Sequence, residues 1–138
     1  MMGKTEESLK AAFAGESMAR NKYTYFAQVA RKEGYHYIAR IFEETADNER
    51  RHAKDEFALL NGIGDTAANL EEAIKGEHYE TTEMYPQFAK DAEEEGKKSV
   101  AGLFRHIARV EAHHRDRYKK LLEMVKSGTV YKREKPIK

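Results

Sequence analysis

Apolar residues recur every three or four positions in four stretches of the chain, which is the spacing of one face of an α-helix. This periodicity predicts helices over residues 5–33, 36–61, 70–95 and 97–126. Asn69, followed three residues later by a glutamate, resembles a capping box and predicts the start of the third helix. Glycines lie near the predicted ends. The pattern predicts an all-α protein built from two helical hairpins.

Acidic residues interrupt the apolar face of every predicted helix. They are Glu16, Glu49, Glu77 and Glu111, with either Glu80 or Thr81 as a further inward position. Acids on a solvated surface would lie on the opposite face. A carboxylate in a core costs several kcal/mol unless it is neutralised, paired or bound to metal.

The second half of the sequence repeats the first at an offset of 62 residues. Equivalent pairs include Tyr23 and Tyr85, Phe26 and Phe88, Ala27 and Ala89, Ala30 and Ala92, Gly34 and Gly96, Ala39 and Ala101, and Phe42 and Phe104. The offset also aligns two Glu-x-x-His motifs, Glu49 to His52 and Glu111 to His114. A third match, from Glu33 to His36, spans a glycine and lies outside these equivalent places, so we interpret it as a chance occurrence.

The repeated motif has the spacing of metal ligands, because positions i and i+3 lie on one face of a helix. Two such motifs and a single glutamate from each of two further helices form the ligand set of a two-metal centre in a four-helix bundle. The predicted ligands are Glu16, Glu49, His52, Glu77, Glu111 and His114, and Glu80 joins them if it, rather than Thr81, takes the further inward position. Tyr23 and Tyr85 face the same way, and their hydroxyls are predicted to hydrogen-bond ligand carboxylates; plain core packing is the alternative for both.

The repeat slips by one residue in the third helix. Glu16 lies seven residues before Tyr23, whereas Glu77 lies eight before Tyr85. Pro86 adjoins the slip and cannot donate a helical hydrogen bond. A π-bulge or a kink in the third helix is predicted to absorb the extra residue.

Composition narrows the class of protein. The formal net charge is +1, so nothing in the overall charge suggests a nucleic-acid partner. No apolar run reaches the length of a membrane span, and we expect a cytoplasmic protein. With no cysteine, the sequence offers no thiolate ligand for zinc or an iron–sulfur cluster. Carboxylate and imidazole ligands favour iron, with manganese or a mixed pair of metals as alternatives.

Four segments resemble the rubrerythrin family, in family order. They are FAGESMARNKYTYFA at 13–27, ETADNERRHA at 44–53, GEHYETTEMYPQFAKDAEEEG at 76–96 and ARVEAHHRDRY at 108–118. The resemblance implies a ferritin-like four-helix bundle with a non-haem di-iron site that reduces hydrogen peroxide to water. By motif position it implies that Glu16 and Glu77 are terminal ligands and that Glu49 and Glu111 bridge the irons.

The resemblance also implies that one ligand changes with oxidation state. His114 would stay on one iron, while Glu80 would bind the other iron in the oxidised state and His52 would replace it on reduction. Many rubrerythrins carry a C-terminal rubredoxin domain with two Cys-x-x-Cys pairs, and this cysteine-free sequence resembles the short members. Electrons are therefore expected from an external donor such as rubredoxin.

Other functions fit a bundle with this site. A ferritin-like protein would oxidise ferrous iron for storage, a manganese catalase-like enzyme would use the same scaffold, and a structural bundle would only bury ion pairs. Residues 1–128 are predicted to be the bundle domain, with hairpins 5–61 and 70–126 and a tail at 129–138.

The predicted link between the hairpins is short. If helices of a ferritin-like bundle run from a shared metal centre to opposite ends, the link must cover about 30 Å lengthwise. Eight steps from Asn61 to Asn69 reach at most about 28 Å. We therefore predict a domain-swapped homodimer, in which each centre takes one hairpin from each chain. Early fraying of the second helix is the alternative.

Overall fold

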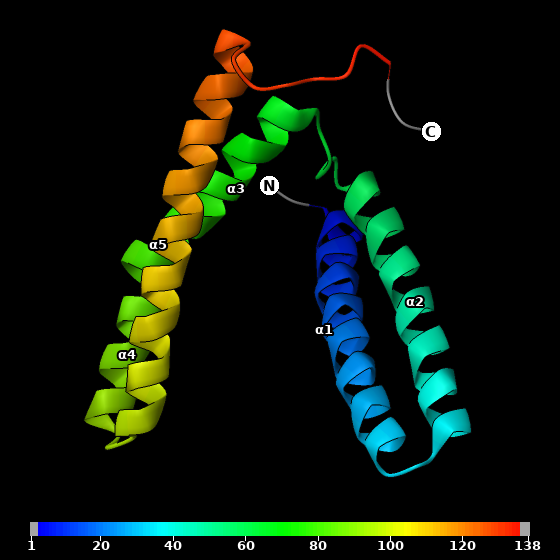
Figure 1. Ribbon diagram of the computed structural model, residues 1–138. Helices are drawn as coiled ribbons and strands as arrows, with labels where there is room; N and C mark the ends of the chain where they lie inside the picture. Colours follow the sequence, from blue (N-terminus) through cyan, green and yellow to red (C-terminus); the bar gives the residue numbers. More distant parts are fainter. Residues whose placement is uncertain (1–2, 136–138) are drawn as a thin grey trace. The chain divides into compact units, whose positions relative to one another are not determined.

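The computed structural model describes residues 3–135 (Figure 1). Its elements are α1 (Lys4–Lys32), α2 (His36–Leu59), α3 (Thr66–Tyr79), the π-helical turn η1 (Glu80–Met84), α4 (Tyr85–Glu94) and α5 (Lys98–Ser127). The predicted all-α fold is confirmed for this part of the chain. The chain divides between Ile63 and Gly64 into two compact units, and each unit is a helical hairpin.

The first hairpin packs α1 against α2, and the second packs α3, η1 and α4 against α5. Gly34 and Gly96 occupy the left-handed region at the two hairpin turns, with φ of 91° and 75°. A residue with a Cβ adopts this conformation only at a cost, which explains the glycine at both equivalent turns. Pairing of the helices as predicted is confirmed within each unit.

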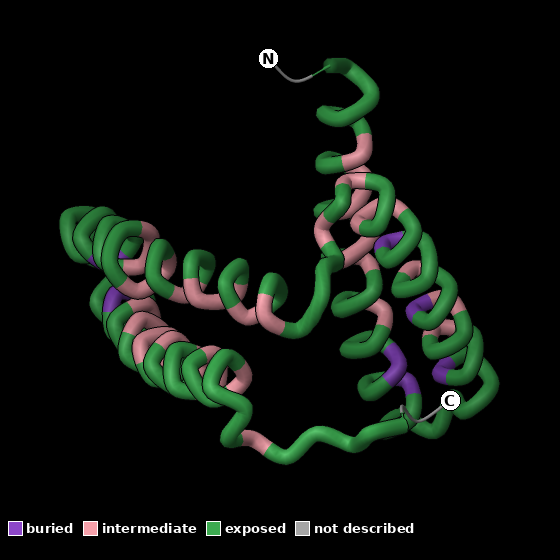
Figure 2. The backbone as a smooth tube through the Cα atoms, turned by 90° about the horizontal axis from the view of Figure 1, so that it is seen from above, coloured by how far each residue is buried: buried purple, intermediate pink, exposed green. Residues whose placement is uncertain are grey.

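Small side chains form the buried core of each hairpin, and among the described residues every buried one is an alanine. They are Ala27, Ala30, Ala39, Ala46 and Ala53 in the first hairpin and Ala89, Ala92 and Ala101 in the second. Alanine lets two helix axes approach closely, since the side chains at a contact set the distance between them. Figure 2 shows these buried positions as short segments of a tube that is otherwise largely exposed.

An aromatic cluster is repeated in the two hairpins. The rings of Phe26 and Phe42 have centroids 5.6 Å apart, and the equivalent rings of Phe88 and Phe104 are also 5.6 Å apart. Tyr23 lies 6.0 Å from Phe42, and Tyr85 lies 5.9 Å from Phe104. The sequence repeat is therefore a repeat of packing as well.

An ion pair is conserved between the hairpins with its polarity reversed. Arg31 of α1 bonds Glu43 of α2. The positions 62 residues later hold Glu93 and Arg105, whose charged atoms lie 2.6 Å apart. The contact between the two positions is thus kept although both residues have changed sign.

The start of the third helix differs from the prediction. The helix begins at Thr66, and Asp65 is its N-cap, with a side-chain oxygen that accepts a hydrogen bond from the Ala68 amide at 2.8 Å. Asn69 is not the cap, because its side chain bonds the backbone of Gly64 at 2.7 and 3.0 Å. The helix starts earlier than predicted because an aspartate cap precedes the asparagine.

The predicted irregularity in the third helix is confirmed. The π-helical turn η1 follows directly on α3, and Pro86 lies in the first turn of α4, where a missing amide hydrogen costs little. One wider turn takes up the residue by which the two repeats differ. None of the helices in the described part of the chain combines the length and apolar character that a bilayer crossing requires.

Candidate metal centre

The first hairpin gathers three of the predicted ligands. Glu16 comes from α1, and Glu49 and His52 come from successive turns of α2. His52 Nδ1 lies 3.2 Å from Glu16 Oε1 and 3.9 Å from Glu49 Oε1. One ligand atom from each residue lies within 4.8 Å of the others, a spacing that suits ligation of a single cation.

The second hairpin gathers the equivalent three. Glu77 comes from α3, and Glu111 and His114 come from α5. His114 Nδ1 lies 3.4 Å from Glu77 Oε1 and 3.6 Å from Glu111 Oε1. These ligand atoms also lie within 4.8 Å of one another, so the repeated motif produces two nearly identical ligand sets.

Burial of the glutamates tests whether a cation fits. Glu16 Oε2 and Glu77 Oε2, equivalent ligands of the two sets, are both buried with no hydrogen-bond partner among the described residues. A buried carboxylate oxygen without a donor is costly, and a proton or a cation removes that cost. Oxygen and nitrogen donors in each set suit iron or manganese. The residues therefore fit a pair of such ions.

Glu80 approaches the second set from the π-helical turn. A hydrogen bond with Glu111, burial and repulsion by the Glu111 charge together raise the pKa of Glu80 to about 7. Thr81, the competing inward residue, donates a hydrogen bond at 2.5 Å to the backbone carbonyl of Ala108 on α5. Glu80 and Thr81 thus both contact α5, rather than one of them excluding the other.

Tyr85 lies beside the carboxylates of the second set. Burial raises the pKa of its phenol, and the charges of Glu80, Glu111 and Glu77 raise it further. A hydrogen bond from this phenol to one of these carboxylates stays a prediction. Tyr23 packs against Phe42 in the equivalent place, and a hydrogen bond from its hydroxyl stays a prediction.

Glu56 is an acidic residue at the first set that the sequence analysis missed. Its pKa is raised by a hydrogen bond with Glu16, by burial and by repulsion from Glu16 and Glu49, against an opposing effect of His52. The sequence could have indicated it, because Glu56 lies one helical turn beyond His52, on the face of the helix that carries Glu49.

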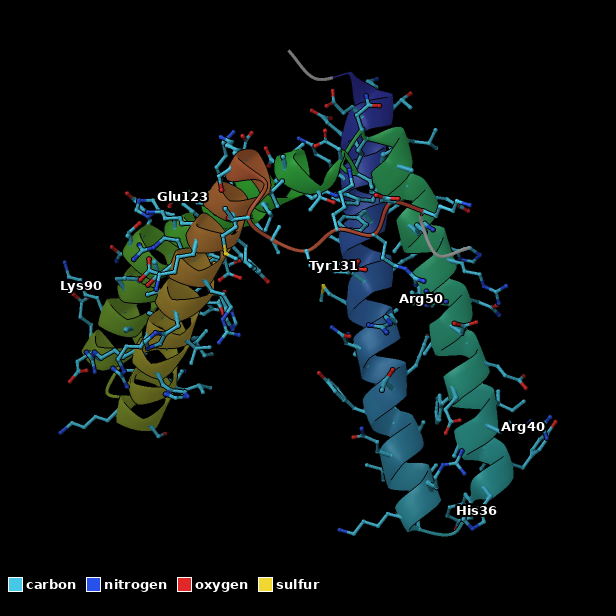
Figure 3. All side chains as sticks on the ribbon, turned by 45° about the horizontal axis from the view of Figure 1, so that its top comes forward. His36, Arg40, Arg50, Lys90, Glu123 and Tyr131 are labelled. Carbon is cyan, nitrogen blue, oxygen red and sulfur yellow. The ribbon has the colours of Figure 1, made fainter. Side chains whose placement is uncertain are left out.

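The remaining Glu-x-x-His match lies away from these sets. Glu33 caps the C-terminal end of α1, and His36 begins α2 at the hairpin turn (Figure 3). A change of chain direction at Gly34 separates the two residues, so they do not share a helical face. The interpretation of this match as a chance occurrence is confirmed.

Known proteins resemble the chain over nearly its whole length. The Rubrerythrin family model matches residues 7–122. A rubrerythrin of Porphyromonas gingivalis is 50% identical, over 97% of this chain and 74% of the relative. Rubrerythrin-1 of Clostridium acetobutylicum is 48% identical, over 95% and 76% of the two chains. A rubrerythrin of Nitratidesulfovibrio vulgaris is 45% identical, over 98% and 78%.

Proposed function

Since the chain belongs to the rubrerythrin family, we propose that it is a non-haem di-iron peroxidase that reduces hydrogen peroxide to water. The observation that carries this proposal is the pair of equivalent Glu–Glu–His sets joined by a seventh residue, Glu80, on the π-helical turn. A symmetrical two-metal centre needs only the six repeated ligands. The seventh offers a ligand that can exchange with another.

The chain's own residues would hold the ions in the following roles. Glu16 and Glu77 would each hold one ion, Glu49 and Glu111 would be shared by the two ions, and His114 would hold one ion throughout. When bound, two ferrous ions supply the two electrons that, with two protons, convert one peroxide into two water molecules. An external donor such as rubredoxin returns the electrons to the centre.

Glu80 and His52 are the residues proposed to exchange. In the detached state, Glu80 keeps its hydrogen bond to Glu111, and its raised pKa of about 7 favours a neutral carboxyl. When it holds an ion, an ionised Glu80 would add one negative charge to the ligand set. His52, whose side chain is 58% exposed, has room to move as its place is taken. The ligand charge therefore follows the oxidation state.

Anaerobic reconstitution with ferrous iron tests the proposal. The reconstituted protein is challenged separately with peroxide and with oxygen, and the absorbance of ferric iron is followed. Fast oxidation by peroxide and slow oxidation by oxygen are expected. The reverse order would support ferroxidase activity instead, and failure to bind about two ions per chain would reject every metal-based function.

We also propose that the centre forms in a domain-swapped homodimer. From Glu49 to the end of α2 at Leu59 is about 15 Å, and from the start of α3 at Thr66 to Glu77 is about 17 Å. If the helices run to opposite ends of a bundle, the link must cover about 32 Å. Seven residue steps reach at most about 25 Å. The earlier start of α3 therefore strengthens the argument made from the sequence.

Exposed apolar side chains support the pairing of hairpins. Phe26 and its equivalent Phe88 are 47% and 42% exposed, and Ile38 and its equivalent Val100 are 47% and 40% exposed. Since the same positions carry large apolar groups in both hairpins, each hairpin offers a matching surface for the other. In a swapped dimer these surfaces would belong to different chains.

Complementation distinguishes a swapped dimer from an unswapped one. One chain carries Glu49→Ala and His52→Ala, the other carries Glu111→Ala and His114→Ala, and the two are refolded together. A swapped heterodimer keeps one of its two centres with all its ligands, and random pairing makes about half of the dimers heterodimers, so bound iron and peroxide reduction return to about a quarter. If neither iron nor activity returns in the mixture, the swap is wrong.

A further inference from the structure

A groove lies between α1 and α2 on the first hairpin, outside the ligand set. Its volume is about 320 Å³, and its floor includes the buried Ala53 and the stacked rings of Phe13 and Phe57, whose centroids are 4.7 Å apart. A Cβ on Gly62 would collide with the Phe57 ring, so glycine lets the loop after α2 lie against that ring. The exposed Ile63 of this loop also lines the groove. The groove therefore has an apolar floor that both helices and the loop build.

The rim of the groove is cationic. Its charged residues are Arg20 of α1 and Arg50 and Lys54 of α2, and none of the described residues that line it is acidic (Figure 3). Arg50 is bonded at 3.0 Å to Asp47, which lies outside the lining. Arg20 and Lys54 are exposed and form no ion pair with any residue in the range 3–135. Apolar surface ringed by free cations is suited to contact with an acidic protein surface.

The groove borders the first ligand set on both helices. Ser17, which lines it, directly follows Glu16 on α1, and Ala53 directly follows His52 on α2. Lys54 is two positions after His52, so the two side chains project to nearly opposite sides of α2. The groove thus opens away from the ligands while lying one helix diameter, about 10 Å, from them. It would stay open when the ligand face of this hairpin packs against another hairpin.

The second hairpin does not repeat this surface. The residues 62 positions after Lys54 and Phe57 are Asp116 and Lys119, so an acid replaces a cation of the rim and a cation replaces an aromatic ring of the floor. The alanine core and the aromatic cluster, by contrast, are present in both hairpins. The packing that the repeats share therefore does not require the groove.

We propose that this groove is the docking site of the external electron donor, a small redox protein that presents carboxylates around an apolar contact. The inference rests on the proposed function, which requires such a donor. Arg20 and Lys54 would pair with carboxylates of the donor, and Phe57 and Ile63 would contact its apolar surface. Electrons pass between proteins only over short distances, and a donor seated here would lie close to the first ligand set. Each encounter would deliver one electron, so two encounters return the two electrons that one peroxide consumes.

Two double variants with the same change of charge test the groove. Arg20→Glu with Lys54→Glu reverses the two free cations of its rim. Lys90→Glu with Arg109→Glu is the matched control, because both residues line a groove on the second hairpin and neither has an ion pair within the described part of the chain. The probe is a rubredoxin of net negative charge.

Two measurements at low ionic strength compare these proteins, each loaded with iron. Isothermal titration calorimetry gives the affinity for oxidised rubredoxin. Stopped-flow absorbance gives the second-order rate at which the ferric protein oxidises reduced rubredoxin. Circular dichroism and iron content check that each variant is folded and loaded, and sedimentation velocity gives its oligomeric state.

The groove variant is expected to bind rubredoxin at least about tenfold more weakly and to oxidise it at least about tenfold more slowly, because acids then face acids. The control variant is expected to stay within about twofold of the parent. Added salt should slow the parent and narrow the gap between the parent and the groove variant, since screening weakens attraction and repulsion alike.

The proposal is overturned if the parent binds no rubredoxin, if the groove variant behaves as the parent does, or if both double variants lose equally. A groove variant that alters the sedimentation of the protein alone would also overturn it, because the groove would then be a contact between copies of the chain. If peroxide does not oxidise the ferrous parent, the proposed function fails, whereas the calorimetric comparison still decides the role of the groove.

Discussion

The two hairpins have the same helical arrangement and differ at a few positions. Those positions lie near the two residues proposed to exchange as ligands, Glu80 and His52. Both have an alanine core, a three-ring aromatic cluster and a Glu–Glu–His set. Only the second contains a π-helical turn, and only the first has an acid beside its terminal glutamate. The repeat thus gives the two hairpins nearly the same structure. The extra residue in the π-helical turn of the second hairpin and the substitution at Glu56 in the first make them different.

The outer surfaces of the hairpins also differ. Tyr25, Val29 and Tyr37 of the first hairpin are 58%, 56% and 74% exposed. Their equivalents 62 residues later are Gln87, Asp91 and Ser99. Positions that pack within each hairpin hold residues of the same type in both repeats, whereas these exposed positions are apolar or aromatic in the first hairpin and polar in the second. Packing against the neighbouring helix restrains sequence change, and exposure relaxes that restraint.

The largest loss of metal affinity is expected from replacing Glu49 or Glu111, which occupy equivalent positions in the two hairpins. Glu49→Gln and Glu111→Gln should each lower metal affinity by about a hundredfold or more, because even groups outside the ligand shell contribute 10–100-fold. Metal content after desalting measures the loss, and the exposed Glu44→Gln on α2 is the control. If only one of the two ligand variants loses metal, the two sets are not functionally equivalent.

Glu80 has no acidic equivalent in the first hairpin. Its replacement is expected to change metal binding little and to slow peroxide reduction strongly. Counted from the ligand glutamates, Glu80 corresponds to Ala19, so the first hairpin has no such acid. Glu80→Gln should keep both ions and slow peroxide reduction by about a hundredfold, as expected for a lost acid–base group or ligand. The exposed Glu83→Gln in the same π-helical turn is the matched control. Loss of metal in Glu80→Gln would instead make Glu80 a permanent ligand.

The same residue predicts how pH affects the metal-free protein. The pKa of Glu80 is about 7 when folded and near 4.5 when unfolded, so the folded state holds the proton more tightly. Its stabilising contribution is complete below pH 4.5 and is lost as pH rises through 7, by about 3 kcal/mol in all, of which about 2 kcal/mol is lost between pH 5 and 7. Urea unfolding at pH 5 and 7, compared between the parent and Glu80→Gln, measures this contribution. A difference between the two proteins that does not change with pH would contradict the assignment.

A threonine hydrogen bond between two helices should contribute more to the free energy of unfolding than one within a single helix. Thr81 bonds the Ala108 carbonyl on α5, whereas Thr45 bonds the Ile41 carbonyl of its own helix. Thr81→Val should lower the free energy of unfolding by about 1–2 kcal/mol, and Thr45→Val by less than about 0.5 kcal/mol. Chemical denaturation of the metal-free variants measures both. Equal losses would show that the bond from η1 to α5 has no special role.

The smallest effect is expected from copying the polarity of one hairpin into the other. The double variant Arg31→Glu with Glu43→Arg reproduces the order of Glu93 and Arg105. Its free energy of unfolding should stay within about 0.5 kcal/mol of the parent, since a half-exposed pair gains little from either order. Arg31→Glu alone, which places two acids together, should be less stable than the double variant. A double variant no better than the single one would mean that the contact is not equivalent in the two hairpins.

Much of this molecule could be predicted from local patterns. The helical periodicity, the offset between the hairpins and the Glu-x-x-His motifs depend on residues a few positions apart, or on direct comparison of two segments. The π-helical turn also followed from counting, because Glu77 and Tyr85 are one residue further apart than Glu16 and Tyr23. Such features need no knowledge of which helices touch.

Two other features could not be predicted from spacing, because the sequence offered two suitable residues for each. The start of α3 was predicted too late, because both Asp65 and Asn69 are suitable caps and only the structure shows which one bonds the free amides. Glu80 and Thr81 were treated as competitors for one inward position, although a wider turn lets both contact α5.

The sequence by itself determined the helices, the repeat and the six residues of the two Glu–Glu–His sets, since spacing along a helix decides which side chains share a face. Only the tertiary structure showed that Glu56 lies against a carboxyl group of the neighbouring helix, because its spacing along α2 does not distinguish it from an ordinary surface acid. Glu16 of α1 is that group, and the contact between them depends on how α1 and α2 pack.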